Sequence, residues 1–222
     1  MQFNAAVVAG ATGMIGEYVI RTLLEDPFYD AITTLTRRPL GMEAKKIEQR
    51  FVDFDRLTTD DLAGATHLFC CLGTTMKKAG SREAFRRVDY EYCERFARLG
   101  RKAGATRLML LSSVGANPGS SSFYLRTKGE AEQAVSALEF EALHIFRPGV
   151  LMGRRNEDRP RERVAAAFSR AFEFAMTGSL ARYRPMPAAV LAASMAAAGE
   201  RGEPGKHLYY YPEIVRLAGF SR

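Results

Sequence analysis

Val8-Ala9-Gly10-Ala11-Thr12-Gly13-Met14-Ile15-Gly16 is the stretch that decides the fold, because it joins two apolar segments of different periodicity. Residues 5–9 are an unbroken run of small apolar residues, which is typical of a strand that is buried on both faces of a parallel sheet. From Ile15 onward, apolar residues recur at helical spacing. The stretch therefore predicts a strand, a tight glycine turn and a helix.

The glycine turn also predicts a phosphate site. Its spacing differs from the commonest dinucleotide-binding fingerprint by one residue in the first gap. Residues without Cβ let the backbone approach a pyrophosphate, and the N–H groups at a helix N-terminus favour negative charge. We expect the turn to bind a dinucleotide through Gly10, Thr12, Gly13, Met14, Ile15 and Gly16. The alternative is that the glycines only close a turn.

The length and composition suit one α/β domain. The chain has 222 residues, of which 47% are hydrophobic, and we expect a single domain over 1–222 in which 150–222 contribute a small substrate-side region. No apolar run approaches the ~20 residues of a membrane span, and no secretory signal precedes the first strand. These features predict a cytoplasmic protein without a membrane partner.

The cysteines and the charge balance indicate no further chemistry. Cys70, Cys71 and Cys93 lack metal-ligand spacing, so we expect reduced core residues and no metal site. The net charge of +7 comes largely from arginines scattered over helices, which is typical of a solvated surface. Without a nucleic-acid-binding motif, nucleic acid stays a minor alternative to a small-molecule substrate.

The rest of the chain alternates strands with helices. Further strands are predicted at 31–36, 50–54, 67–72, 107–111 and 144–146, with a short one at 208–211. Helices are predicted after Ser81 and at 124–138, 164–176, 188–198 and 212–218. The apolar stripe on the helix after Ser81 is expected to pack in the core or between the subunits of a homodimer. The alternation predicts a doubly wound α/β fold of the Rossmann type with a mainly parallel sheet.

Polar residues follow several of these strands, at the edge where ligands bind in such sheets. Arg37 and Arg38 stand where an NAD site usually presents an acid, and guanidinium groups suit the 2′-phosphate of NADP. This favours NADP, with NAD as the alternative. Asp53 is expected either to contact adenine or to form a turn. At the end of the strand predicted at 67–72, we expect Leu72, Gly73 and Thr74 to contact the cofactor.

A second group of candidate site residues follows the strand predicted at 107–111. Ser112 and Ser113 end that strand, and Tyr124 and Lys128 lie four residues apart on a helix, so their side chains share one face. One bound molecule can therefore contact both. The two serines cannot be separated by position alone; we prefer Ser113, because the later hydroxyl clears the strand end.

These motifs, in this order and together with Arg147-Pro148-Gly149, resemble the short-chain dehydrogenase/reductase family across about residues 5–153. The chain is most similar to atypical members, particularly the branch of the Tat-interacting oxidoreductase. The resemblance implies that Tyr124 is the general acid/base, that Lys128 holds the nicotinamide ribose and stabilises the phenolate, and that Ser113 steadies the substrate. It also implies that Ser112, Pro148 and Gly149 contact the cofactor. A lysine charge ~4 Å from the phenolate, at an effective dielectric of ~20, would contribute about 4 kcal/mol.

The expected activity is therefore NADP(H)-dependent oxidation or reduction at a carbonyl or alcohol centre. Two alternatives stay open. An epimerase or dehydratase acting on a nucleotide-linked substrate uses the same Tyr and Lys, and a non-catalytic NADP(H)-sensing protein would keep only the cofactor site. The charged segment 153–163 is expected to be a solvated loop or a substrate loop.

Overall fold

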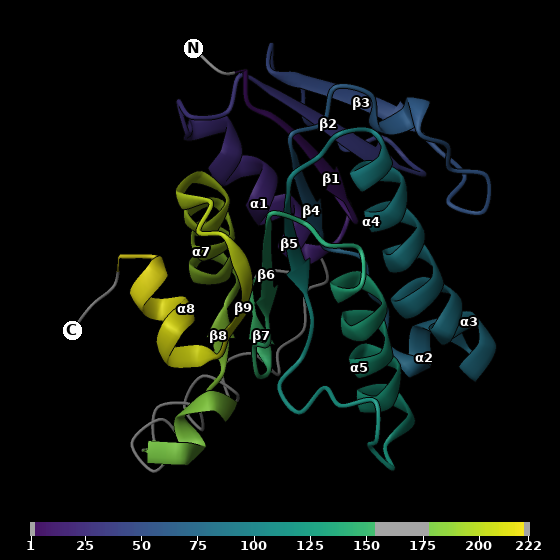
Figure 1. The fold of residues 1–222 in the computed structure, drawn as a ribbon, viewed down its shortest axis with the longest axis vertical. Coiled ribbons are helices and arrows are strands. Elements are labelled where there is room, and N and C mark those ends of the chain that lie inside the picture. The colour runs from purple at the N-terminus through teal and green to yellow at the C-terminus, as the bar shows by residue number, and fades with distance from the viewer. Residues whose placement is uncertain (1–2, 154–177, 220–222) are drawn as a thin grey trace.

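A single seven-stranded parallel sheet forms the centre of the computed structural model, which describes residues 3–153 and 178–219. The strand order is β3-β2-β1-β4-β5-β6-β9, and every pairing is parallel (Figure 1). The strands are β1 (Ala5–Ala9), β2 (Ala31–Thr36), β3 (Ile47–Phe51), β4 (His67–Cys70), β5 (Arg107–Leu111), β6 (Ala142–Phe146) and β9 (Gly205–Tyr209). The predicted doubly wound fold of the Rossmann type is confirmed.

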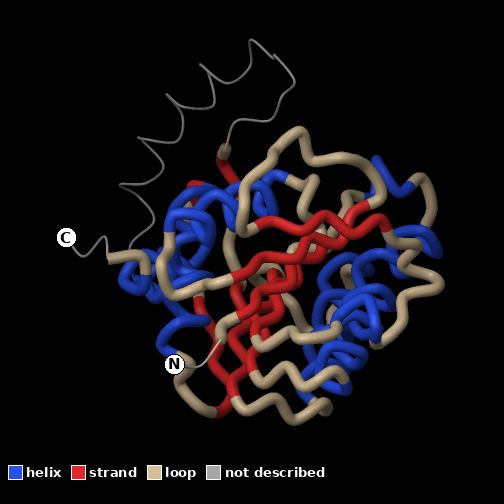
Figure 2. Tube along the Cα trace, turned by 90° about the horizontal axis from the view of Figure 1, so that it is seen from above, coloured by secondary structure: helices blue, strands red, loops and turns tan. Residues whose placement is uncertain are grey.

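Helices cover both faces of the sheet, as Figure 2 shows from above. On one face α1 (Met14–Glu25) packs against the alanine-rich α7 (Ala188–Arg201), and α8 (Tyr211–Leu217) packs beside α7. On the other face lie α4 (Tyr92–Lys102) and α5 (Phe123–Ser136). Each face has its own apolar core, which explains why the central strand β1 is an unbroken apolar run.

Several short elements complete the chain. Between β4 and α4 lie α2 (Met76–Ala79), α3 (Arg82–Arg86) and a π-helical turn, η2 (Arg87–Glu91). Elsewhere are the 3₁₀ turns η1 (Asp60–Leu62) and η3 (Gly178–Tyr183), and the two-stranded parallel pair β7 (Leu151–Met152) and β8 (Met186–Pro187). Ser81 caps α3 by accepting a hydrogen bond from the amide of Ala84 at 3.1 Å. The cap is confirmed, and so is the long helix predicted after it: helical residues run without a break from Arg82 to Lys102, and η2 is a π-helical turn within this run.

Two predicted strands are displaced in the structure. The strand predicted at 50–54 is Ile47–Phe51, because its pairing with β2 runs from Ile32 beside Ile47 to Thr36 beside Phe51. The strand predicted at 208–211 is Gly205–Tyr209, because β6 fixes its register in the same way. In both cases the neighbouring strand, rather than local composition, sets the ends. The predicted helix at 164–176 and nearly all of the charged segment lie outside the described residues.

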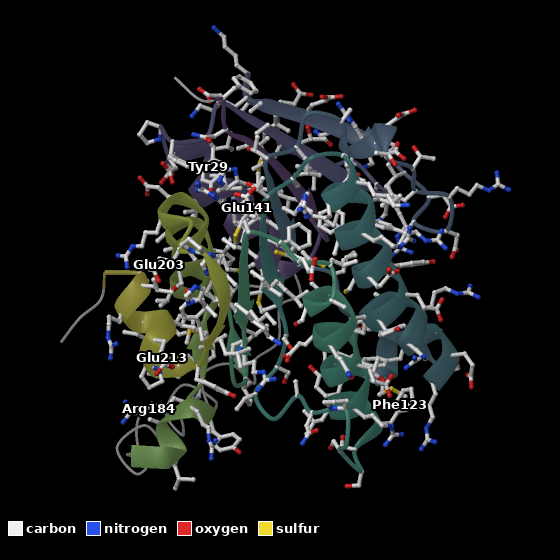
Figure 3. All side chains as sticks on the ribbon, in the orientation of Figure 1. Tyr29, Phe123, Glu141, Arg184, Glu203 and Glu213 are labelled. Atoms are coloured by element: carbon white, nitrogen blue, oxygen red, sulfur yellow. The ribbon has the colours of Figure 1, made fainter. Side chains whose placement is uncertain are left out.

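The parallel arrangement gives the sheet two different ends. Tyr29 and Glu141 lie at the end where the strands begin, and Phe123 lies at the opposite end, as Figure 3 shows. The loops that follow the strands all meet at this second end, where the first turn of α5 also lies. Among the described residues, no helix combines the length and the apolar character that crossing a bilayer requires.

Candidate active site

The turn between β1 and α1 is built so that only glycine fits at two positions. Gly10 has φ +84°, and a Cβ there would lie 2.4 Å from the carbonyl oxygen of Cys71. A Cβ on Gly16 would lie 2.2 Å from the carbonyl oxygen of Gly10. Without side chains at these positions, the helix start packs tightly against the ends of β1 and β4.

The N-terminus of α1 carries no side-chain cap. Gly13 occupies the N-cap position, and no side chain accepts a hydrogen bond from the first turn of the helix. Thr12 and Gly13 are exposed at the edge where the strands end, and the amide of Gly13 donates a hydrogen bond to the carbonyl oxygen of Gly10 at 2.9 Å. Uncapped amides and an exposed glycine fit a phosphate group, as the spacing of the glycines predicts.

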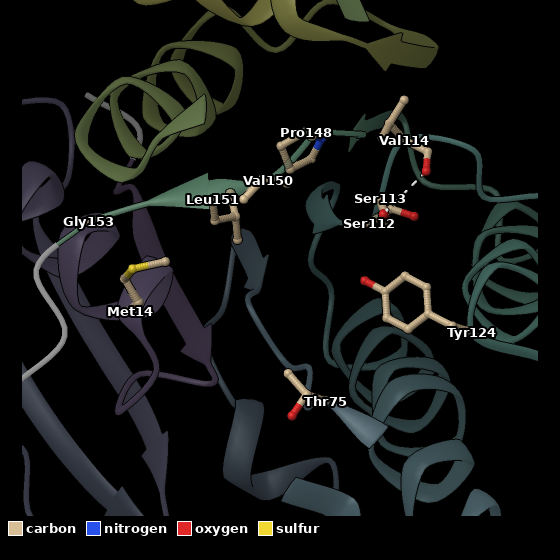
Figure 4. Close-up of a pocket in the computed structure, with 11 residues that line it drawn as sticks. Met14, Thr75, Ser112, Ser113, Val114, Tyr124, Pro148, Val150, Leu151 and Gly153 are labelled. Atoms are coloured by element: carbon tan, nitrogen blue, oxygen red, sulfur yellow. Dashed lines mark hydrogen bonds between the residues drawn. The ribbon is translucent and has the colours of Figure 1, made fainter. Parts of the chain in front are cut away.

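A cavity of about 570 Å³ opens beside this turn. Figure 4 shows residues from four parts of the chain around it: Met14 of α1, the loop after β4, the loop after β5 with the first turn of α5, and the loop after β6. Its walls are Met14, Thr75, Ser112, Ser113, Val114, Tyr124, Pro148, Gly149, Val150, Leu151 and Gly153. The cavity therefore brings six of the sequence-predicted residues together: Met14, Ser112, Ser113, Tyr124, Pro148 and Gly149.

Tyr124 presents its hydroxyl to this cavity. Its side chain is half-buried, its ring centroid lies 5.5 Å from that of Phe85, and its hydroxyl points into the space that the lining residues surround (Figure 4). Across the cavity, the hydroxyl of Ser113 donates only a long 3.3 Å hydrogen bond to the carbonyl oxygen of Val114. Both hydroxyls are therefore accessible to a bound molecule.

Ser112 is engaged elsewhere. Its hydroxyl donates to the buried carboxylate of Glu132, two turns after Tyr124 on α5. The same carboxylate forms a bidentate ion pair with Arg147, which also donates to the hydroxyl of Tyr210 at 2.7 Å. These bonds to Glu132 raise the pKa of Arg147. Of the two serines, Ser113 is the one whose hydroxyl remains free for a substrate.

Lys128 is buried and forms an ion pair. Its ammonium lies 2.8 Å from the carboxylate of Asp89, and the two side chains are 6% and 0% exposed. The second oxygen of Asp89 accepts a hydrogen bond from the amide of Thr74 at 2.8 Å. Burial is the largest single influence and lowers the pKa of Lys128, but the Asp89 carboxylate, together with Cys93 and Tyr124, more than offsets it, and the pKa is raised.

The charged residues Asp89 and Glu132 were not predicted from the sequence, nor were the cavity-lining residues Thr75, Val114, Val150, Leu151 and Gly153. A signal for Asp89 was available, since it lies in the apolar stripe four residues after Phe85 and seven before Phe96, both of which are buried. A charged residue within such a stripe needs a buried partner.

The remaining predicted residues lie at the same edge but outside the cavity lining. Arg37 and Arg38 follow β2 and are exposed; within the described part of the chain, neither side chain has an ion-pair partner. Asp53 lies two residues beyond β3 and accepts a hydrogen bond from the amide of Asp55 at 3.0 Å, as a turn residue does. Leu72 packs into the core, and Gly73 lies against Lys128.

The chain matches a known protein family and is similar to several known proteins. The pattern that defines a family described as NAD(P)H-binding matches residues 10–173. Protein HTATIP2 of Rattus norvegicus is 39% identical over 173 residues, which cover 76% of this chain and 71% of that protein. The mitochondrial protein fmp52 of Emericella nidulans is 34% identical over 178 residues, covering 76% and 75% of the two chains.

Solved structures share the fold. MoeE5 in complex with UDP-glucose and NAD matches with a TM-score of 0.70 at 16% identity, over 97% of this chain and 81% of that one. DesIV, a dTDP-glucose 4,6-dehydratase from Streptomyces venezuelae with NAD and TYD bound, matches with a TM-score of 0.71 at 15% identity, over 97% and 79%. The family match and the HTATIP2 relative thus confirm the expected resemblance to an NAD(P)-binding family, and the solved structures confirm the fold.

The relatives also correct one expectation. We predicted a cytoplasmic protein, but several similar proteins, including those of Debaryomyces hansenii and Candida albicans, are named mitochondrial. The prediction was wrong in its reasoning, because the lack of a secretory signal or an apolar span does not distinguish the cytoplasm from the mitochondrion.

Proposed function

Because the chain belongs to the NAD(P)H-binding family, we propose that it is an NADP(H)-dependent oxidoreductase of the short-chain dehydrogenase type, acting on the carbonyl or alcohol group of a small molecule. One observation carries the proposal: the hydroxyls of Ser113 and Tyr124 share a cavity with Met14, the first residue of the helix that follows the glycine turn. A phosphate site and a proton donor therefore adjoin one space.

The residues around this space suit a dinucleotide. The uncapped N-terminus of α1 would hold the pyrophosphate, and the loop of Pro148 and Gly149 would contact the nicotinamide end. The unpaired guanidinium groups of Arg37 and Arg38 would contact a 2′-phosphate, which favours NADP over NAD. When bound, the nicotinamide supplies or accepts the hydride.

The chain's own residues then handle the proton. In the reducing direction, the Tyr124 hydroxyl protonates the carbonyl oxygen of the substrate, and Ser113 donates a hydrogen bond to the same oxygen. Lys128, one turn further along α5 and buried, contributes positive charge near the phenolate that remains. The lining of the cavity carries no charged side chain among the described residues, which suits a neutral carbonyl compound.

The first test is the Tyr124→Phe variant, assayed by NADPH consumption with a panel of aldehydes, ketones and nucleotide sugars. We expect turnover to fall by about 10²-fold or more, as for loss of a general acid, while NADPH binding measured by calorimetry stays within about twofold. Tyr18→Phe, a half-buried tyrosine on α1, is the matched control and should leave turnover unchanged.

Other outcomes separate the alternatives. Epimerisation or dehydration of a nucleotide sugar without net NADPH consumption would replace the proposed reaction. NADPH binding by the wild type with no turnover of any compound would instead support a sensing role. Full activity of Tyr124→Phe would show that the proton donor is misassigned.

A further inference from the structure

Asp89 stands out because it is a fully buried carboxylate in an irregular piece of helix. It lies at the centre of the π-helical turn η2, between α3 and α4, and η2 packs against α5. π-helical turns are rare, and they occur frequently at functional sites. An isolated carboxylate at this depth would be strongly unfavourable, so its partners determine its role.

Both carboxylate oxygens of Asp89 are used, and they reach two different walls of the site. One lies 2.8 Å from the ammonium of Lys128, on the helix turn after Tyr124. The other accepts a hydrogen bond from the amide of Thr74, next to the cavity residue Thr75. A single side chain thus joins the loop after β4 to the helix that carries the tyrosine.

Resting on the proposed function, we propose that Asp89 is a positioning residue, which holds the Lys128 ammonium toward Tyr124 and fixes the loop after β4 beside the cofactor site. Among the six ion pairs between described residues, this pair is the most deeply buried. Asp89 itself contacts neither the cavity nor a substrate and acts through Lys128.

The loop after β4 covers the pair directly, with an exposed glycine over it. A Cβ on Gly73 would lie 3.4 Å from Asp89 Oδ1 and 3.5 Å from Lys128 Nζ, so only backbone separates the pair from solvent at this position. An ammonium has three N–H donors, and the ion pair with Asp89 involves one side of the group. In the proposed arrangement the hydroxyls of a ribose and of Tyr124 would accept hydrogen bonds from the same ammonium.

The carboxylate also sets the charge state of the lysine. Three titratable groups face Lys128: Asp89 from η2, the Cys93 thiol from α4 and the Tyr124 phenol from α5. None of these supplies a second cation. Burial is the largest single influence and disfavours a charged lysine, but the Asp89 carboxylate, with smaller contributions from Cys93 and Tyr124, raises the pKa of Lys128 above its ordinary value. Without the carboxylate, the strongest of the influences that oppose burial would be lost.

The direct experiment follows the titration of Lys128 by NMR in protein carrying ¹³Cε-labelled lysine, without cofactor, with the signal assigned through Lys128→Arg. In the wild type we expect Lys128 to stay protonated beyond the ordinary lysine value of about 10.4. A wild-type titration at or below that value would overturn the proposal, and this measurement needs no variant that might misfold. In Asp89→Asn we expect the midpoint to fall by about two pH units or more.

The second experiment measures NADPH affinity at pH 7 and pH 9.5 by calorimetry. Asp89→Asn should bind about tenfold more weakly at the higher pH, because Lys128 loses its charge there. Asp89→Glu, which keeps the carboxylate, should restore the wild-type pH dependence. The matched control is Asp55→Asn, which removes an exposed carboxylate bonded to the hydroxyl of Tyr92 and should behave as the wild type.

These results separate the two proposals. If Asp89→Asn shifts the Lys128 titration but neither protein binds NADPH, the proposed function fails while the role of Asp89 in charging Lys128 stands. If the wild type binds NADPH and Asp89→Asn binds it with the same affinity at both pH values, the positioning role is refuted.

Discussion

The Glu132→Gln substitution tests whether the network beside the cavity stabilises the site as strongly as its burial implies. The Glu132 side chain is 5% exposed and that of Arg147 is 16% exposed, and the carboxylate accepts hydrogen bonds from two of the three guanidinium nitrogens and from the Ser112 hydroxyl. Glutamine keeps the shape but removes the charge and turns an amide NH₂ toward Arg147. Breaking a buried ion pair from one side costs about 3–5 kcal/mol.

Urea unfolding followed by circular dichroism measures this loss as a change in the free energy of unfolding. Thermal unfolding is a second readout: for a chain of this length each kcal/mol corresponds to roughly 2–4 °C in Tm, so the melting temperature should fall by about 6–20 °C. The control is Glu17→Gln, which breaks an exposed ion pair with Arg21 on α1 and should cost about 0.5 kcal/mol or less. If Glu132→Gln loses under about 1 kcal/mol, or no more than the control, the network does not stabilise the fold as argued.

Two further predictions concern acid stability and cofactor choice. Burial lowers the pKa of both His67 and His144 to about 4, so the unfolded chain, with values near 6.5, binds protons first as the pH falls. Urea unfolding should therefore show a loss of about 2 kcal/mol for each histidine between pH 8 and pH 5, and constant stability over this range would contradict their neutral burial. Replacing Arg37 and Arg38 together by alanine should weaken NADPH binding about 10-fold or more and leave NADH binding within about twofold, as calorimetry can measure. Equal losses for the two cofactors would remove the argument for NADP.

The central strands follow from local patterns because they are buried on both faces. Apolar runs such as residues 5–9 and 108–111 mark such strands without reference to their neighbours, and the structure has strands at 5–9 and 107–111 with the predicted bounds. The edge strand β3 is different. Three of its five residues are half-buried and two are exposed, so its bounds come from pairing with β2, which composition does not reveal.

The site was predictable in its order along the chain but not in its charges. Tyr124 and Lys128 share a helix face by spacing alone. The partner of Lys128 is 39 residues away, in a turn whose π-helical winding no periodicity predicts. The estimate of about 4 kcal/mol from a bare lysine charge therefore described an arrangement that the structure does not have. The phenolate of Tyr124 would face an ammonium that is already paired with Asp89, so its stabilisation depends on orientation as well as distance.

The most direct test of the central claim is a crystal structure of the protein grown with NADP⁺. Our account predicts the pyrophosphate on the amides that follow Gly13, the 2′-phosphate beside Arg37 and Arg38, and the nicotinamide in the cavity near the hydroxyl of Tyr124. Density for the cofactor at another place, or crystals that contain none at a concentration that saturates related enzymes, would contradict it.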